Sequence, residues 1–182
     1  MDLPTIISAL YPVSRNLTNY TVGIVGGAQS ITYWDTSALG PQPTQSQLDA
    51  AWPAVELATA QKSQIETISA GCEASIIAGF TSSALGAAYI YPSKPTDQLN
   101  LLGEHSASMN PNNPTTWSTK FWCADANGVW DIRVHTAAQI QQVFNDGVAR
   151  KLACIEQNKS LANQVMAATT VAAVQAIVWV SP

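Results

Sequence analysis

The side chains best suited to catalysis are few and far apart in this sequence. Its two histidines, His105 and His135, are 30 positions apart, and only Glu104 places an acid beside one of them. Adjacent residues of a helix point in different directions, so Glu104 and His105 do not predict a catalytic dyad. No Gly-rich phosphate loop, GxSxG nucleophile motif or HExxH zinc motif occurs. We therefore expect no enzyme, with no catalytic residue and no cofactor.

The three cysteines, Cys72, Cys123 and Cys154, do not predict a metal site or a disulfide framework. Their number is odd and no CxxC motif occurs. Cys123 and His135 fall on neighbouring strands of a predicted hairpin, but on opposite faces, and two or more further zinc ligands are missing. We expect three buried free thiols and no metal.

Aromatic and cationic side chains suggest a different chemistry, the binding of a partner protein. In a hairpin predicted over residues 118–135, Trp122 is expected opposite Arg133, on the face away from the core. Trp and Arg are enriched in interface hot spots. Trp117 would widen this patch, and Trp34 is a similar candidate on the polar face of another hairpin. The competing interpretation is that a third strand or a helix covers these faces.

The turn of the second hairpin fixes which side chains share a face. Asn127-Gly128 predict a two-residue type I′ turn, because both residues tolerate positive φ. The pairs expected on the apolar face are Cys123 with Ile132, Phe121 with Val134 and Asp125 with Trp130. The pairs expected on the opposite, solvated or partner-facing side are Trp122 with Arg133, Lys120 with His135 and Ala124 with Asp131.

Around this hairpin the sequence predicts an α+β fold of two short β-hairpins and two long antiparallel helices packed on each other. The first hairpin pairs residues 19–25 with 28–34 across Gly26-Gly27, with Trp34 outward. Capping boxes at Thr44 and Thr136 begin the long helices, the first of which Pro53 interrupts or kinks. The remaining expectations are a helix over 4–10, loops over 36–44 and 110–116, a turn-rich hairpin over 79–94, a helix capped by Thr96, and a terminal helix from Thr169-Thr170 to Trp179.

Composition excludes several classes of partner. Eight basic residues against twelve acidic ones leave no basic stripe for nucleic acid or an anionic membrane. No apolar run is long enough to span a membrane, and the N-terminus lacks the basic region of a signal peptide, so we expect synthesis in a cytoplasm. The chain holds 55 Ser, Thr, Asn and Gln residues but only 20 charged ones. Such a surface is typical of a chain that packs against other chains.

Three motifs in order give the C-terminal two-thirds a family resemblance. They are GF-x-S-x-ALG from Gly79, DQ-x-NL from Asp97, and VW-x-x-R-x-HTAAQ from Val129. Over roughly residues 62–180 the chain resembles an uncharacterised domain of bacteriophage and prophage tail modules, which often stands at the C-terminus of tail-fibre or tail-fibre-assembly proteins.

The N-terminal third resembles small prophage tail-module proteins. The matching residues are Tyr11-Pro12, Trp34, Pro41, Pro43-Thr44, Leu48 and Ala50-Ala51-Trp52. We therefore expect a helix-hairpin-helix tail-module region over residues 1–52 and a phage-tail-associated α+β domain over residues 53–182. Neither resemblance brings a catalytic residue.

The resemblance implies a non-enzymatic tail structural protein that is made in the host cytoplasm and resides in the virion tail. Its expected partners are a tail fibre, a baseplate component or a second copy of this chain. One alternative is a tail-fibre assembly chaperone that acts transiently in the host cytoplasm. Another is a carbohydrate-binding receptor-recognition module that uses Trp122 or Trp34 as a stacking platform.

Overall fold

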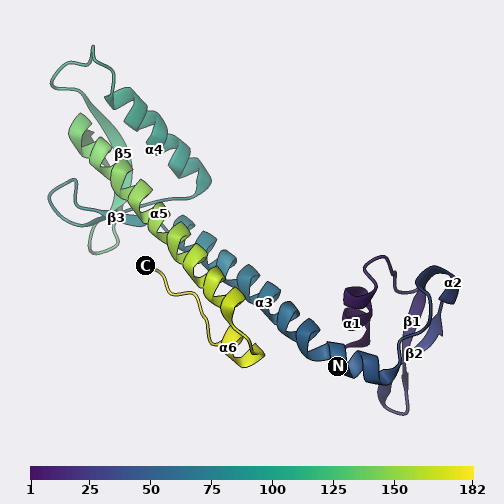
Figure 1. The fold of residues 1–182 in the computed structure, drawn as a ribbon. Coiled ribbons are helices and arrows are strands. Elements are labelled where there is room, and N and C mark those ends of the chain that lie inside the picture. The colour runs from purple at the N-terminus through teal and green to yellow at the C-terminus, as the bar shows by residue number, and fades with distance from the viewer. The chain divides into compact units, whose positions relative to one another are not determined.

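The computed structural model describes residues 1–182 and contains six helices and two antiparallel sheets, which confirms the predicted α+β class (Figure 1). The chain divides into two compact units. The first comprises Met1–Ser63 and Ala168–Ala176, and the second comprises Gln64–Ala167 and Ile177–Pro182. Helix α3 contributes residues to both units. The predicted boundary after residue 52 stays a prediction.

The first unit has a small apolar core between a helix and a hairpin. Its elements are α1 (Leu3–Leu10), β1 (Tyr20–Val25), β2 (Ala28–Trp34), α2 (Thr36–Leu39), the start of α3 (Gln45–Ile77) and α6 (Val171–Gln175). Asp2 begins α1, because its carboxylate accepts a hydrogen bond from the Thr5 backbone N–H at 3.1 Å. The buried core residues are Leu3, Ile6, Ile7, Tyr20 and Leu48.

The segment predicted as a loop over residues 36–44 contains the short helix α2. Asp35 explains the difference, because its Oδ1 accepts hydrogen bonds from the backbone N–H groups of Ser37 at 3.0 Å and Ala38 at 3.1 Å. These bonds satisfy N–H groups that the first turn of a helix leaves free. Asp35 before Thr36-Ser37 is therefore a signal for the start of a helix, and the prediction of a loop overlooks it.

The first hairpin has the predicted two-residue turn, but the predicted faces hold only in part. Gly26 and Gly27 have φ values of 61° and 84°, as a type I′ turn requires. A β-bulge between Thr21 and Val22 then shifts the register, so that Tyr20 pairs with Trp34. The extra residue is Thr32 on β2, so it reverses the faces of Tyr33 and Trp34 alone, while Tyr20, Val22 and Ile31 pack on the core side as predicted. The prediction that Trp34 lies on the polar face is therefore wrong.

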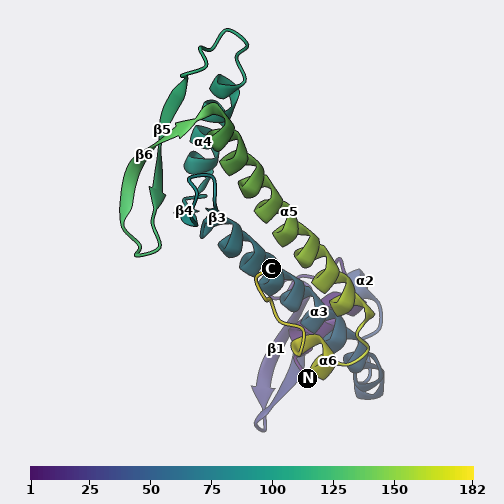
Figure 2. The same cartoon turned by 90° about the vertical axis from the view of Figure 1, so that its left-hand side faces the viewer.

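The second unit is a four-stranded sheet with helices packed on one face. Its elements are the end of α3, β3 (Phe80–Ser82), β4 (Tyr89–Tyr91), α4 (Pro95–Ser108), β5 (Ser118–Ala124), β6 (Trp130–Thr136) and α5 (Ala137–Ala167). The strand order is β3-β4-β5-β6, and β4 joins β5 through the single pair Ile90 and Ala124. Figure 2 shows α4 and α5 on the same side of the sheet. The buried core between them comprises Phe80, Ala84, Tyr91, Leu101, Phe121, Cys123, Ile140 and Val143.

The register of the second hairpin differs from the prediction by one residue. Phe121 pairs with Arg133, Trp122 with Ile132 and Cys123 with Asp131. The turn is a three-residue loop, because Gly128 N–H donates to Asp125 O at 2.9 Å and Asp125 N–H donates to Val129 O at 3.1 Å. Only Gly128, with φ of 77°, is left-handed, which is the pattern of a type I turn followed by a bulge.

Asp125 is the physical reason for the longer turn. Its Oδ1 accepts hydrogen bonds from the backbone N–H groups of Asn127 at 2.9 Å and Val129 at 3.0 Å. An aspartate that bonds the backbone two residues on favours a turn that begins at itself. The one-residue shift moves Ile132 and Val134 to the outside and turns Arg133 inward.

The long helices begin at the predicted capping boxes. Thr44 N–H donates to Gln47 Oε1 at 2.8 Å, and Thr136 N–H donates to Gln139 Oε1 at 2.9 Å. Helix α3 continues through Pro53 from Gln45 to Ile77. Within the second unit, the end of α3 runs beside α5 (Figures 1 and 2), where Cys72 Sγ donates to Cys154 O at 3.4 Å.

Two smaller boundaries differ from the prediction, and one expectation holds. Helix α4 begins at Pro95 rather than after a Thr96 cap, and Asp97 Oδ2 accepts from Lys94 N–H at 3.0 Å. Helix α6 ends at Gln175, well before Trp179. The three cysteines are buried and free, as expected. No helix is both long and apolar enough to span a membrane.

Trp179 leaves the helical path because it packs on α3 of its own unit. A Cβ built at Gly71 would lie 2.6 Å from Trp179 Cγ, so only a glycine admits the indole there. The indole Nε1 donates a hydrogen bond to Ser75 Oγ at 2.8 Å. The last residues of the chain therefore belong to the second unit.

Candidate partner-binding surface

The face of the four-stranded sheet that points away from α4 and α5 is apolar and exposed. We call it the outer sheet face and define it by Ile90, Trp122, Trp130, Ile132 and Val134. Each of these side chains is between 42% and 57% exposed. Together they leave on the order of 500 Å² of apolar surface in water, which is as large as the largest patch on a typical monomer.

Two tryptophans dominate this face and organise each other. Trp122 and Trp130 lie on neighbouring strands, with ring centroids 6.2 Å apart and planes inclined by 15°. Diagonal neighbours in an antiparallel pair are within reach of aromatic side chains. The stacked rings form a rigid platform, and Ile132 continues it because it pairs directly with Trp122.

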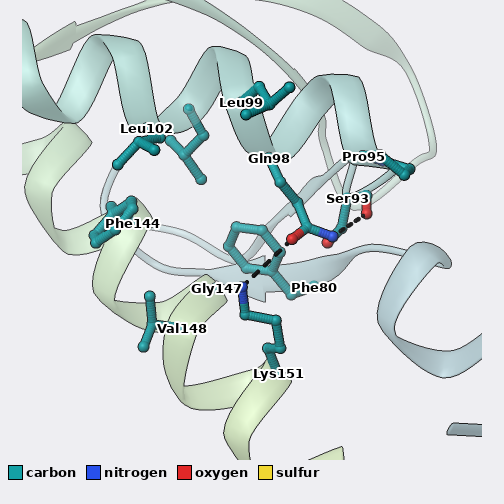
Figure 3. Close-up of a pocket in the computed structure, with 11 residues that line it drawn as sticks. Phe80, Ser93, Pro95, Gln98, Leu99, Leu102, Phe144, Gly147, Val148 and Lys151 are labelled. Carbon is teal, nitrogen blue, oxygen red and sulfur yellow. Dashed lines mark hydrogen bonds between the residues drawn. The ribbon is translucent and has the colours of Figure 1, made fainter. Parts of the chain in front are cut away.

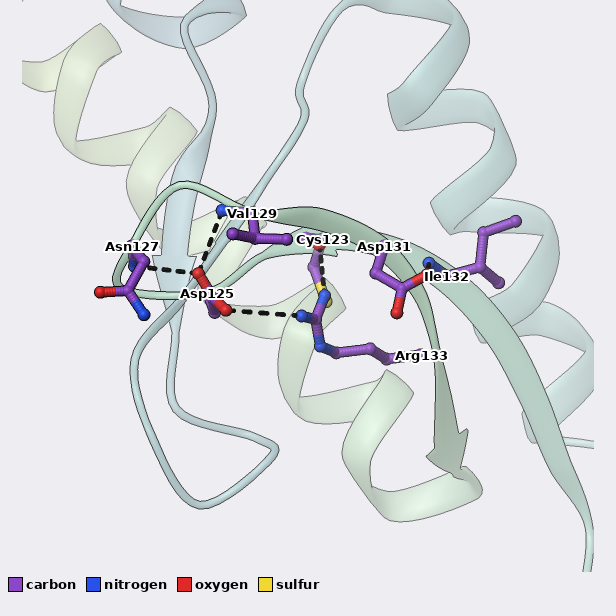
Figure 4. A network of polar contacts seen from close by, with 7 residues as sticks. All are labelled: Cys123, Asp125, Asn127, Val129, Asp131, Ile132 and Arg133. Carbon is purple, nitrogen blue, oxygen red and sulfur yellow. Dashed lines mark hydrogen bonds and ion pairs between the residues drawn. The ribbon is translucent and has the colours of Figure 1, made fainter.

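Arg133 lies on the inner face, not beside Trp122 as predicted (Figure 4). Its Nη1 donates to Cys123 O at 2.8 Å, and its Nη2 lies 3.8 Å from Asp125 Oδ2. The guanidinium also lies 5.0 Å from the ring centroid of Tyr89. These contacts tie the turn of the second hairpin to β4, so Arg133 holds the hairpin in place beneath the outer sheet face.

The other two predicted partner-binding residues are held by the cores of their units. Trp117 is partly buried and packs against the core of the second unit, so it does not widen the outer sheet face. Trp34 packs edge-on against Tyr11, with the ring centroids 4.9 Å apart, and its Nε1 donates to Gly40 O at 2.9 Å. Of the four predicted residues, only Trp122 lies on an exposed apolar face.

His135 is fully buried, contrary to the expectation that it faces solvent or a partner. Its Nδ1 donates to Arg133 O at 2.9 Å, which leaves Nε2 to accept the Tyr91 hydroxyl at 2.8 Å. Burial lowers the pKa of His135 from its ordinary value. Cys123 and His135 share the inner face, so their predicted separation is wrong, but no group of three His, Cys, Asp or Glu side chains forms a metal site.

Sequence reasoning missed four of the five residues of the outer sheet face. Ile132 and Val134 were expected in the core because the turn was read as two residues long. Trp130 was paired with Asp125 for the same reason. Asp125 before Asn127-Gly128 was the signal that could have corrected all three, because it favours the longer turn. Ile90 carried no such signal, because its place depends on the long-range pairing of β4 with β5.

A second apolar surface lies between α4, α5 and β3 (Figure 3). It is a groove of about 500 Å³, and the residues that line it are Phe80, Ser93, Pro95, Gln98, Leu99, Leu101, Leu102, Phe144, Gly147, Val148 and Lys151. Gln98 spans its polar end, because Nε2 donates to Ser93 O at 2.9 Å and Oε1 accepts from Lys151 at 3.4 Å. Such a lining suits a ligand that has an apolar group in the groove and a hydrogen-bond acceptor beside Lys151.

Comparisons with known proteins connect the chain to two families. Residues 59–178 match the model of a domain of unknown function, DUF4376, and residues 3–60 match the model of the XkdW protein. No curated protein and no solved structure matches the chain. The two matches indicate a bacteriophage-related protein.

Proposed function

This chain belongs to the DUF4376 family, and from that premise we propose that it is a non-enzymatic structural protein of a bacteriophage tail. In this proposal it binds a tail fibre or baseplate component and resides in the virion tail after synthesis in the host cytoplasm. The match of residues 3–60 to the XkdW protein supports a phage setting for the N-terminal unit as well.

The observation that carries the proposal is the outer sheet face. A contiguous apolar patch of this size is costly to leave in water. Large exposed apolar patches of this kind often mark sites of protein binding. Stacked tryptophans at its centre supply the large, rigid contact area that dominates binding energy at interfaces. We therefore assign Trp122 and Trp130 as the anchors of the interface.

The partner is a protein surface with apolar pockets and little charge. The five defining residues of the outer sheet face are apolar, and the one charged side chain beside them is Lys120, which pairs with Val134, so charge pairing is a minor part of its recognition. Eight basic residues in the whole chain also give no footprint for nucleic acid or an anionic membrane. The adjacent aliphatic side chains favour an apolar protein partner over a glycan, whose hydroxyl groups need hydrogen-bonding neighbours.

The test is a complementation experiment in a phage or prophage that lacks this chain. The deletion is complemented with the wild-type chain, with the Trp122→Ala/Trp130→Ala variant, or with Tyr33→Ala as a control exposed aromatic of the other hairpin. Tailed particles are counted by electron microscopy, and purified particles are analysed by cross-linking mass spectrometry. We expect the wild-type and Tyr33→Ala chains in the particles, cross-linked to a tail protein, and the double variant absent from them.

The alternatives give different outcomes in the same experiment. A chain that is required for tails yet absent from purified particles is an assembly chaperone. A chain that is present without cross-links near β5 or β6, and that binds a glycan array through Trp122, is a receptor-recognition module. Either result overturns the proposed structural role.

A further inference from the structure

Strand β6 ends the four-stranded sheet and leaves one edge unpaired (Figure 2). Natural proteins protect such edges with proline, lysine, bulges or very short strands. The seven residues of β6, Trp130–Thr136, contain no Pro or Lys and pair with β5 without a bulge, and the inward-facing Asp131 and Arg133 are the only Asp, Glu, Lys or Arg residues of the strand. An edge this long, beside an exposed apolar face, is open to pairing with another strand.

The hydrogen bonds of the turn show which residues of β6 face the free edge. Asp125 N–H donates to Val129 O, so the backbone groups of Val129 point toward β5. Backbone direction alternates along a strand, so those of Asp131 and Arg133 also point toward β5. The N–H and C=O groups of Trp130, Ile132 and Val134 therefore point to the open edge.

We propose that two copies of this chain pair through β6, antiparallel, about a twofold axis that passes beside Ile132. In this register Ile132 faces Ile132 of the second copy, and Trp130 faces Val134 of the second copy. These are the hydrogen-bonded positions of the new ladder. In the single chain the Ile132 N–H donates to Asp131 Oδ1 at 2.8 Å, and in the dimer it leaves that carboxylate for the Ile132 carbonyl of the second copy. The two four-stranded sheets join into one, and their outer sheet faces become a single apolar surface.

The side chains of β6 argue for a second copy rather than a foreign strand. In the proposed register Asp131 lies opposite Arg133 of the second copy, and the symmetry repeats this pair. The Asp131–Arg133 pair and its symmetry mate are both non-hydrogen-bonded pairs, in which opposing side chains are closest. Opposite charges directly across from each other stabilise a strand pair. The strand Trp-Asp-Ile-Arg-Val is thus complementary to itself when it is reversed.

Arg133 has capacity for this additional contact. Its guanidinium uses Nη1 for Cys123 O and Nη2 for Asp125, at 2.8 Å and 3.8 Å. A guanidinium carries five N–H donors, so donors remain for a carboxylate from the second copy. Asp131 is exposed and accepts only the adjacent Ile132 N–H within its own chain, at 2.8 Å.

The experiment is sedimentation velocity of the purified full chain over a range of concentrations, which requires no tail and is independent of the proposed function. We expect a monomer–dimer equilibrium. Asp131→Arg is expected to weaken the dimer by about 30-fold, because it places like charges opposite each other twice. Asp49→Arg makes the same charge change at an exposed site of the N-terminal unit and should leave the dimer intact.

A mixing experiment separates this pairing from a general loss of association. Asp131→Arg carries two arginines at the paired positions, and Arg133→Asp carries two aspartates. Each variant alone should be monomeric, and an equal mixture should form a heterodimer. If Arg133→Asp fails to fold by circular dichroism, Ile132→Lys takes its place, because it sets two ammonium groups beside the twofold axis and should be monomeric.

Three results would overturn the proposal. The first is a wild-type chain that stays monomeric at all concentrations. The second is an Asp131→Arg dimer as stable as that of the wild type. The third is a β6 edge that cross-links in particles only to a different tail protein, which would assign the edge to a foreign strand.

Discussion

The two hairpins of this chain both depart by one residue from the register that an unbroken alternation and a two-residue turn would give, with different results. In β1–β2 a bulge after Thr21 turns Trp34 toward the core and leaves Tyr33 outside. In β5–β6 a longer turn sends Ile132 and Val134 outside. A single backbone residue decides both outcomes, because strand side chains alternate with a period of two. In the first hairpin the shift completes a core, and in the second it creates the outer sheet face.

The comparison predicts that the same substitution has different costs in the two hairpins. Trp34→Ala removes an indole that packs on Tyr11 and donates to Gly40 O, so we expect it to destabilise the N-terminal unit by about 3 kcal/mol. The measurement is urea denaturation, with hydrogen exchange to localise the loss to the first unit. A cost below about 1 kcal/mol would contradict the inward placement of Trp34.

The turn of the second hairpin provides the next largest effect. Asp125→Ala removes the acceptor of the Asn127 and Val129 N–H groups and the acid beside Arg133, and should cost about 1.5 kcal/mol of unfolding free energy. Denaturation of the second unit measures this cost. Asp131→Ala, studied at low concentration, loses one local bond and serves as the matched control.

The register of the second hairpin can also be observed directly by nuclear magnetic resonance. Cross-strand nuclear Overhauser effects in the wild-type chain should connect Trp122 with Ile132. If they connect Trp122 with Arg133 instead, the turn has two residues, and the exposed apolar face does not exist.

Local signals in the sequence predicted most of the elements but not their faces. Capping boxes at Thr44 and Thr136 and the glycines of the first turn gave correct positions, because these interactions lie within a few residues. The faces depend on a bulge at Thr21 and on the competition between Asp125 and Asn127 for the turn. Of the candidate site, only Trp122 was placed outside correctly, because its position on β5 did not depend on that competition.

The inner face of the second hairpin is expected to be sensitive to acid. Burial lowers the pKa of His135, so the unfolded chain binds a proton there more readily than the folded chain. Stability from this residue is complete above the ordinary histidine pKa of about 6.5 and is lost as the pH falls below it. The thermal midpoint of unfolding should therefore decrease as the pH is lowered from about 7.5 to about 5.

Two variants test whether His135 is the source of this dependence. His135→Gln should flatten the profile, because it removes the titrating group. His105→Gln, which keeps His135, should retain the fall. A wild-type midpoint that rises on acidification would contradict a buried neutral imidazole.

The smallest effect on stability is expected on the outer sheet face. Trp122→Ala should change the unfolding free energy by less than about 1 kcal/mol, because nearly half of the side chain is already exposed. The same variant should lower affinity for the tail partner by about 2 kcal/mol or more. Urea denaturation and binding measurements together check this split. A large loss of stability would assign Trp122 to the core instead.

The central claim is that the outer sheet face is open in the free chain and covered in the tail. Hydroxyl-radical footprinting of Trp122 and Trp130, read by mass spectrometry, tests this claim directly in the dilute chain and in intact particles. We expect rapid oxidation of both indoles in the free chain and protection of both in particles. Equal oxidation in the two states, or protection in the free chain, would contradict the account.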